Sequence, residues 1–217
     1  MLYHDPRIGF VHQPRTSGTS VEHALNKKYP HQHKLFVDIS SLKTVNPAVI
    51  KIKSVNTRRL PNETLEYHKK HATYSELVDY APDYKYYTTV RHPKTKLESL
   101  YRLVAWSTTD GVPWVDVDFN TWVEHFLIGG SYMPEQDILD TRNYGLTQSE
   151  FIGDAEWHKM EEGGIWKALD IEKPLHRYKL SDLDIDIQWN DKSKLLCREY
   201  YAEDYNRFKY SDDTNNA

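Results

Sequence analysis

The chain has 217 residues, with 28 Lys and Arg against 32 Asp and Glu, so its formal net charge is −4, and 39% of its residues are hydrophobic. This size and composition indicate one folded domain, which we predict over residues 1–210 with a disordered tail at 211–217. The mean hydropathy of −0.76 and the lack of an apolar core in residues 1–10 argue against a membrane-spanning helix and a signal peptide, so we expect a soluble, cytoplasmic protein. The single Cys197 excludes an intramolecular disulfide and a cysteine-only zinc site.

The first predicted elements are a strand, a polar loop and a helix. Residues 8–12 form a short apolar run that ends at Pro14, which is typical of a buried strand. Apolar residues at 21, 24 and 25 have helical spacing, and Ser17 or Thr19 would cap that helix.

The same order of elements recurs further along the chain. Residues 86–90 are aromatic and β-branched, as strands often are. Pro93 then suits the first turn of a helix, whose apolar face is predicted at positions 97, 100, 101 and 104. A short helix is predicted between the two units, at 74–80.

The remaining elements complete an α/β pattern. We expect a helix over 119–127 closed by Gly129 and Gly130, a strand over 176–180, and a last amphipathic helix from 191 to about 210. Strands that alternate with helices predict an α/β fold with a central parallel sheet covered on both faces by helices.

The loop after the first strand has the chemistry of a phosphate cradle. Backbone N–H groups at a helix N-terminus, hydroxyls and one arginine can converge there on a single anion. The predicted anion-binding residues are Arg15, Thr16, Ser17, Gly18, Thr19 and Ser20.

The loop is not the phosphate loop of nucleoside triphosphatases. That motif requires a lysine after its second glycine and a leading glycine, and Thr19 and Gln13 stand at those places. An ordinary capped turn is the alternative interpretation of this loop taken by itself.

A second anion site is predicted at the end of the second unit's strand. Arg91 ends that strand and Ser99 lies two turns into the following helix, and ligands of open α/β sheets bind at the carboxyl ends of strands. The charge distribution agrees, because residues 1–60 carry ten Lys and Arg against three Asp and Glu, whereas residues 110–217 carry eleven against 23.

Together the two motifs resemble the sulfotransferases that use 3′-phosphoadenosine 5′-phosphosulfate (PAPS), particularly the Golgi carbohydrate enzymes. Pro14 to Ser20 match the family's 5′-phosphosulfate motif at five of seven places, with Arg15 where the family has lysine. The family's 3′-phosphate motif is matched by Val90, Arg91, Pro93, Ser99, Tyr101 and Arg102. The resemblance implies a P-loop-like three-layer fold, PAPS as co-substrate, no metal, and a role for Arg15 in steadying charge as sulfate leaves.

The candidate base for the acceptor hydroxyl is His71. The segment from Tyr67 to Leu77 resembles the part of uronyl 2-O-sulfotransferases that carries their catalytic histidine, and histidine suits proton transfer near neutral pH. His68, Glu76 and Asp79 are the alternatives for this role, and a metal site at the two histidines lacks an obvious third ligand. The resemblance implies a saccharide acceptor.

Other classes of function remain open at this point. A nucleotide or shikimate-type kinase is disfavoured by the missing lysine, while a non-catalytic PAPS- or glycan-binding module is suggested by Arg15. Nucleic-acid binding is weakened by the lack of an aromatic and basic recognition pattern. The absence of a membrane anchor, which the Golgi relatives have, suggests a bacterial or viral soluble enzyme, or a trimmed catalytic domain.

Overall fold

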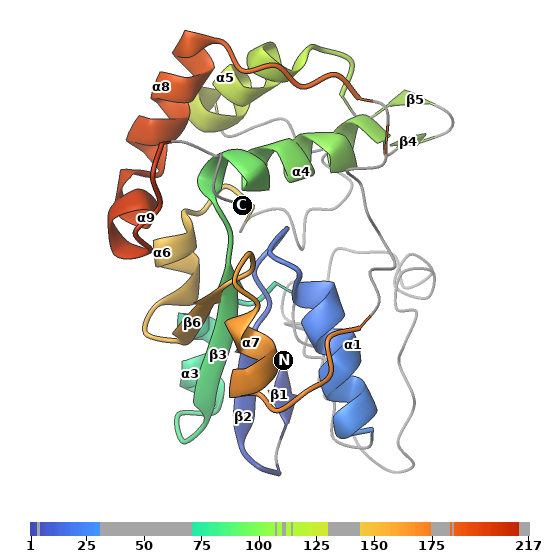
Figure 1. Ribbon diagram of the computed structural model, residues 1–217, viewed down its shortest axis with the longest axis vertical. Coiled ribbons are helices and arrows are strands. Elements are labelled where there is room, and N and C mark those ends of the chain that lie inside the picture. The colour runs from blue at the N-terminus through green and yellow to red at the C-terminus, as the bar shows by residue number, and fades with distance from the viewer. Residues whose placement is uncertain are drawn as a thin grey trace, which may run out of the picture.

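The computed structural model describes residues 1–3, 5–30, 71–106, 108–109, 112–113, 115–129, 144–174, 183 and 185–212. Over these residues the chain has an α/β fold built on a mixed four-stranded sheet with the strand order β1-β2-β3-β6 (Figure 1). The strands are β1 (Leu2–Tyr3), β2 (Ile8–Val11), β3 (Lys85–Val90) and β6 (Glu156–Lys159). A separate antiparallel ribbon joins β4 (Thr108–Thr109) to β5 (Val112–Pro113).

The centre of the sheet is parallel, as the sequence predicts, but its β1 edge is not. β2 pairs with β3 in parallel register and β3 pairs in the same sense with β6, whereas β1 runs antiparallel to β2. The expectation of a purely parallel sheet is therefore wrong at this edge. Too few residues separate β1 from β2 for the crossover that a parallel connection requires. The strand predicted at 176–180 lies outside the described residues.

The helices expected before residue 130 are confirmed, except that the last of them includes Gly129. They are α1 (Gly18–Lys28), α3 (Tyr74–Tyr80), α4 (Pro93–Trp106) and α5 (Phe119–Gly129). In α4 the residues predicted for the apolar face are all buried, because they pack against α5 and α8 in one core cluster.

The second half of the chain has more helices than the sequence pattern indicates. The helix expected from 191 to about 210 is divided into α8 (Asp191–Tyr200) and α9 (Ala202–Arg207). The division lets α8 pack on α4 and α5 while α9 packs on α6 (Gln148–Ile152). A further short helix, α7 (Gly164–Ala168), follows β6.

Apolar side chains from opposite faces of the sheet enter two different core clusters. Phe10 and Tyr87 lie in a cluster with residues of α1 and α7. Val11 and Val90 lie in a second cluster with residues of α3 and α6. This alternation follows from the two-residue period of a strand. A third cluster joins α4, α5 and α8 beyond the carboxyl ends of β2 and β3 (Figure 1).

Within the described part of the chain, no helix has the length and apolar character needed to cross a membrane.

The charged residue Lys96 lies inside the core. The Lys96 side chain is 2% exposed, and its ammonium lies 5.5 Å from the centre of the Tyr201 ring. Burial lowers the pKa of Lys96 to about 8, against the opposing attraction of Asp204 and Cys197. The folded state therefore binds the Lys96 proton less tightly than the unfolded chain does, and the charged form destabilises the fold.

We predict that Lys96→Met stabilises the protein at pH 7. Below about pH 8 the lysine is charged in both states, so the desolvation cost is fully present, and replacing it raises the free energy of unfolding by about 1–3 kcal/mol. Between about pH 8 and 10 the unfolded chain binds more protons at this position, so the native protein gains stability relative to the variant as pH rises. Urea unfolding at pH 7 and pH 9.5 measures both effects. Lys27→Met, at a side chain that is 73% exposed on α1, is the control, and an equal response of the two variants would contradict the prediction.

Candidate functional site

The loop between β2 and α1 is tied to the neighbouring strand β3. The hydroxyl of Thr89, near the end of β3, donates to the carbonyl oxygen of Thr16 at 2.5 Å. The Thr16 hydroxyl in turn donates to the carbonyl oxygen of Gln13 at 3.1 Å. Thr16 is fully buried. It therefore holds the shape of the loop, and parallel pairing of β2 with β3 places that loop beside Arg91.

The backbone of the loop adopts a left-handed conformation at two residues that are not glycine. Arg15 and Ser17 both have φ of 65°. Each such residue costs about 1–2 kcal/mol, which the fixed surroundings must offset. Ser17 occupies the N-cap position of α1, as the sequence indicates, but its side chain makes no capping hydrogen bond.

Gly18 packs directly against the ring of His12. A β-carbon at Gly18 would lie 2.0 Å from Cδ2 of that ring, which no side chain can tolerate without displacement. Glycine is therefore needed here because the His12 ring packs against the backbone. The sequence suggests a different reason, namely close approach of the backbone to an anion.

The two predicted anion motifs meet through a pair of hydrogen bonds. The guanidinium of Arg15 donates to the Ser99 hydroxyl from Nε at 3.1 Å and from Nη2 at 2.8 Å. Ser99 is a buried residue of α4. Two segments that lie 84 positions apart thus share one polar centre.

Arg91 adds a second guanidinium to this centre. Its Nη1 donates to the Arg15 carbonyl oxygen at 3.4 Å, and its Nε donates to the Thr95 hydroxyl at 3.0 Å. Burial lowers the pKa of Arg91, and among the neighbouring charges Glu161 opposes this shift whereas Arg15 adds to it. Burial also lowers the pKa of Arg15, and the phenol of Tyr144 opposes it.

No carboxylate of the described residues lies within 4.0 Å of either guanidinium. Arginine keeps its proton in such surroundings. Two partly desolvated positive charges side by side, without an acidic partner among these residues, are suited to an anion of more than one charge.

The candidate base, His71, is held by the backbone. Its Nδ1 lies 2.8 Å from the carbonyl oxygen of His12, and because a carbonyl oxygen only accepts, Nδ1 carries the proton. In the neutral ring Nε2 is then the basic nitrogen. The hydroxyl of Tyr144 lies 3.4 Å from that nitrogen. The same Tyr144 raises the pKa of Arg15 against the effect of burial, so this phenol acts on both the candidate base and the arginine.

The structure places the remaining predicted residues as follows. Thr19 is exposed and Ser20 half-exposed on the first turn of α1. Of the alternative bases, Glu76 closes a capping box at the start of α3, Asp79 is exposed, and His68 lies outside the described residues. No cluster of three or more His, Cys, Asp or Glu that could hold a metal occurs in the part of the chain that is described.

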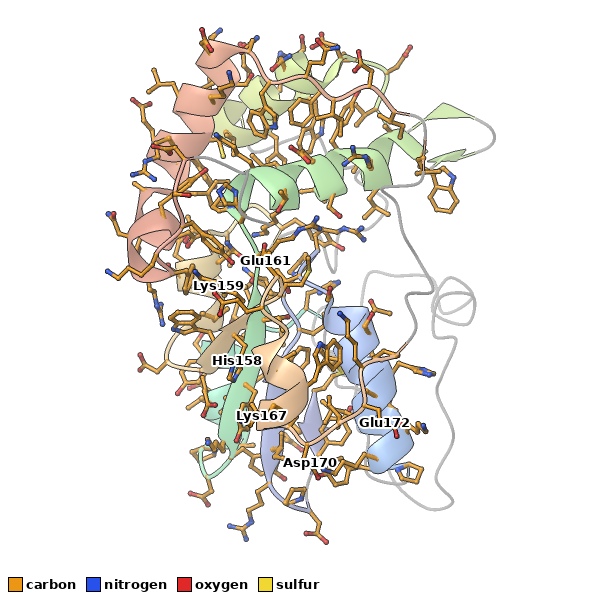
Figure 2. The ribbon with its side chains drawn as sticks, viewed as in Figure 1. His158, Lys159, Glu161, Lys167, Asp170 and Glu172 are labelled. Carbon is orange, nitrogen blue, oxygen red and sulfur yellow. The ribbon has the colours of Figure 1, made fainter. Side chains whose placement is uncertain are left out.

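The sequence reasoning missed several residues that support the site. Tyr144 and His12 contact the candidate base. Glu161, which follows β6 (Figure 2), accepts a hydrogen bond from the His92 backbone at 2.9 Å. Gln148 contacts the backbone of Arg91. Only Gln148 carries a local signal, because it follows Thr147 in a Thr-x-x-Glu capping box.

Comparison of the chain with protein-family models, with curated proteins and with solved structures gives no match. The function therefore has to be argued from the residues themselves and from the resemblance of the two motifs.

We predict that Gly18→Ala destabilises the protein. The new β-carbon would displace the His12 ring, and overpacking of this kind costs about 1–3 kcal/mol in the free energy of unfolding. Gly145→Ala is the matched control, because a β-carbon there meets nothing within 4 Å. Chemical denaturation of both variants measures the difference, and equal stability of the two would show that His12 adapts without cost.

Proposed function

We propose that the chain is a sulfotransferase, which moves the sulfuryl group of PAPS to a hydroxyl, or an amine, of an acceptor. The same proposal includes a P-loop-like, three-layer fold, in which the loop between β2 and α1 holds the co-substrate. The resemblance of the two motifs supports the family, and the adjacency of their two arginines supports a polyanionic ligand.

The observation that carries the proposal is the polar centre formed by Arg15, Ser99 and Arg91. PAPS carries negative charge at both its 3′ and 5′ ends, and two guanidinium groups that contact no carboxylate among the described residues complement such a ligand. The Gln13 amide, at the start of the loop, is fully buried with neither Oε1 nor Nε2 hydrogen-bonded among the described residues. Its unused hydrogen bonds are a further sign that a polar ligand belongs here.

By the resemblance, the loop from Arg15 to Ser20 holds the 5′-phosphosulfate, while Arg91 and Ser99 hold the 3′-phosphate. Arg15 stands where the family has lysine, and its permanent charge favours the anion that forms as the bridging oxygen leaves sulfur. The Ser99 hydroxyl, which accepts from Arg15 in the structure, can donate its own hydrogen to a phosphate oxygen.

His71 is the proposed general base. With Nδ1–H fixed on the His12 carbonyl oxygen, Nε2 can take the proton of the acceptor hydroxyl while the acceptor oxygen bonds to sulfur. The bond between sulfur and the bridging phosphate oxygen breaks in the same displacement, which leaves adenosine 3′,5′-bisphosphate. This scheme needs no metal. A saccharide is the proposed acceptor class, on the resemblance to uronyl 2-O-sulfotransferases.

A non-catalytic PAPS-binding module is the second candidate. It is favoured by the direction of the Arg15 side chain, which is held by two hydrogen bonds to Ser99 of the 3′-phosphate motif. Calorimetry with PAPS and ATP, followed by transfer of labelled sulfate to a panel of glycans, separates the candidates. Binding of PAPS without transfer to any acceptor would favour the module, and binding of ATP without response to PAPS would contradict both.

We predict that Arg91→Ala weakens the binding of adenosine 3′,5′-bisphosphate by about 10- to 100-fold, the cost of losing charge-assisted hydrogen bonds. Isothermal calorimetry measures the dissociation constant. Arg7→Ala is the control, because Arg7 is exposed just before the amino end of β2, whereas the candidate site lies at the carboxyl end of that strand. If both variants bind like the native protein, Arg91 does not hold the ligand.

We predict that His71→Gln abolishes transfer and spares binding. Glutamine can still donate to the His12 carbonyl oxygen but supplies no basic nitrogen, and loss of a general base costs about 10²- to 10⁴-fold in rate. Sulfate transfer and bisphosphate affinity are measured together. His23→Gln, at an exposed position of α1, should leave both unchanged. Full turnover in His71→Gln would assign the base to another residue.

A further inference from the structure

The main chain of Arg91 is held by one buried side chain. The N–H of Arg91 donates to Oε1 of Gln148 at 2.9 Å, and Nε2 of Gln148 donates to the Arg91 carbonyl oxygen at 2.7 Å. The register of β3 with β6 ends at Val90, so the side-chain amide continues the hydrogen bonding of the strand for one residue more. That residue is the one whose guanidinium enters the candidate site.

Gln148 is itself fixed from the C-terminal part of the chain. Gln148 is the first residue of α6 and is fully buried. The carboxylate of Asp204, on α9, accepts from the N–H groups of Gln148 and Ser149 and from the Ser149 hydroxyl, each at 2.8 Å. A carboxylate at a helix N-terminus satisfies donors that the helix leaves open and is favoured by the helix dipole. Asp204 thereby fixes the main chain from which the Gln148 side chain extends.

The next peptide is held from another element. The N–H of His92 donates to Oε1 of Glu161 at 2.9 Å, so the turn between β3 and α4 is set by side chains far along the sequence. A guanidinium that must meet a phosphate oxygen is sensitive to small displacements of its own main chain, because shifts near 1 Å remove good hydrogen-bond geometry.

We propose that Gln148 is a positioning residue of the anion site: it sets the main chain of Arg91 so that the guanidinium meets the 3′-phosphate, and Asp204 holds Gln148 in place. This proposal rests on the proposed function. It assigns to the acidic second half of the chain, where the sequence shows no catalytic motif, a defined part in recognition of the ligand.

The test compares two ligands that differ only in the 3′-phosphate. The ratio of the dissociation constant of adenosine 5′-monophosphate to that of adenosine 3′,5′-bisphosphate reports how well the 3′-phosphate is held. Gln148→Met keeps the length of the side chain and removes both hydrogen bonds to Arg91. We expect this ratio to fall about tenfold, the lower end of the effect seen when supporting partners of a binding residue are lost. A loss of general stability would weaken both ligands alike and leave the ratio unchanged.

The chain supplies a matched control. The side-chain amide of Asn120 also makes two hydrogen bonds to backbone groups, from Nδ2 to the Gln188 carbonyl oxygen at 2.8 Å and to Oδ1 from the Asn190 N–H at 3.0 Å. It lies on α5, and neither hydrogen bond involves a residue of the candidate site. Asn120→Leu removes the same kind of clamp and should leave the ratio unchanged.

A second variant guards against misfolding of Gln148→Met. Gln148→Glu keeps the shape and the bond from the Arg91 N–H, but places an oxygen against the Arg91 carbonyl oxygen in place of the donor. It should also lower the ratio. In the background of Arg91→Ala neither change at Gln148 should lower the ratio further, because the two residues act on one contact.

The outcomes separate the two proposals. If the native protein prefers the bisphosphate and Gln148→Met or Gln148→Glu keeps that preference, the positioning role is wrong and the proposed function stands. Additive effects of Gln148 and Arg91 variants would overturn the positioning role as well. If the native protein shows no preference for the bisphosphate, the proposed function fails, and the positioning role fails with it.

Discussion

The parallel pairing of β2 with β3 determines where the residues of the site lie. Because parallel strands end at the same edge of a sheet, the loop after β2 and the turn after β3 are brought together there. The hydrogen bond from Thr89 to the loop backbone and the two from Arg15 to Ser99 depend on that register. A shift of one residue would turn the side chains of β3 to the opposite face and separate the two arginines.

The same pairing creates an electrostatic cost. It places Arg15 near enough to Arg91 to lower the pKa of the Arg91 guanidinium further, in surroundings that are partly removed from water. Nothing in the described residues neutralises them by a direct carboxylate contact, although Glu161 and Glu98 act on Arg91 from further away. Such an arrangement is less favourable without an anion than with one, which agrees with the proposed anion site.

The acidic half of the chain carries the scaffold of the basic site. Asp204 holds the start of α6, Gln148 holds the backbone of Arg91, and Glu161 holds that of His92. In each case a side-chain oxygen accepts from the backbone. The excess of acidic residues after position 110 thus includes groups that accept hydrogen bonds from the backbone of these turns.

The sequence by itself determined the local elements and the chemistry of the two motifs. β2, β3, α1, α3 and α4 follow from apolar spacing and turn residues, since these signals act over a few positions. Tertiary structure alone decided the antiparallel edge at β1, the division between α8 and α9, and the contacts of Gln148, Tyr144 and His12. These depend on pairing and packing between segments far apart in the chain, where a single residue type carries no information about its partner. The sequence predicts Arg15 and Arg91 as anion-binding residues, but that the two share one polar centre follows only from the register of the sheet.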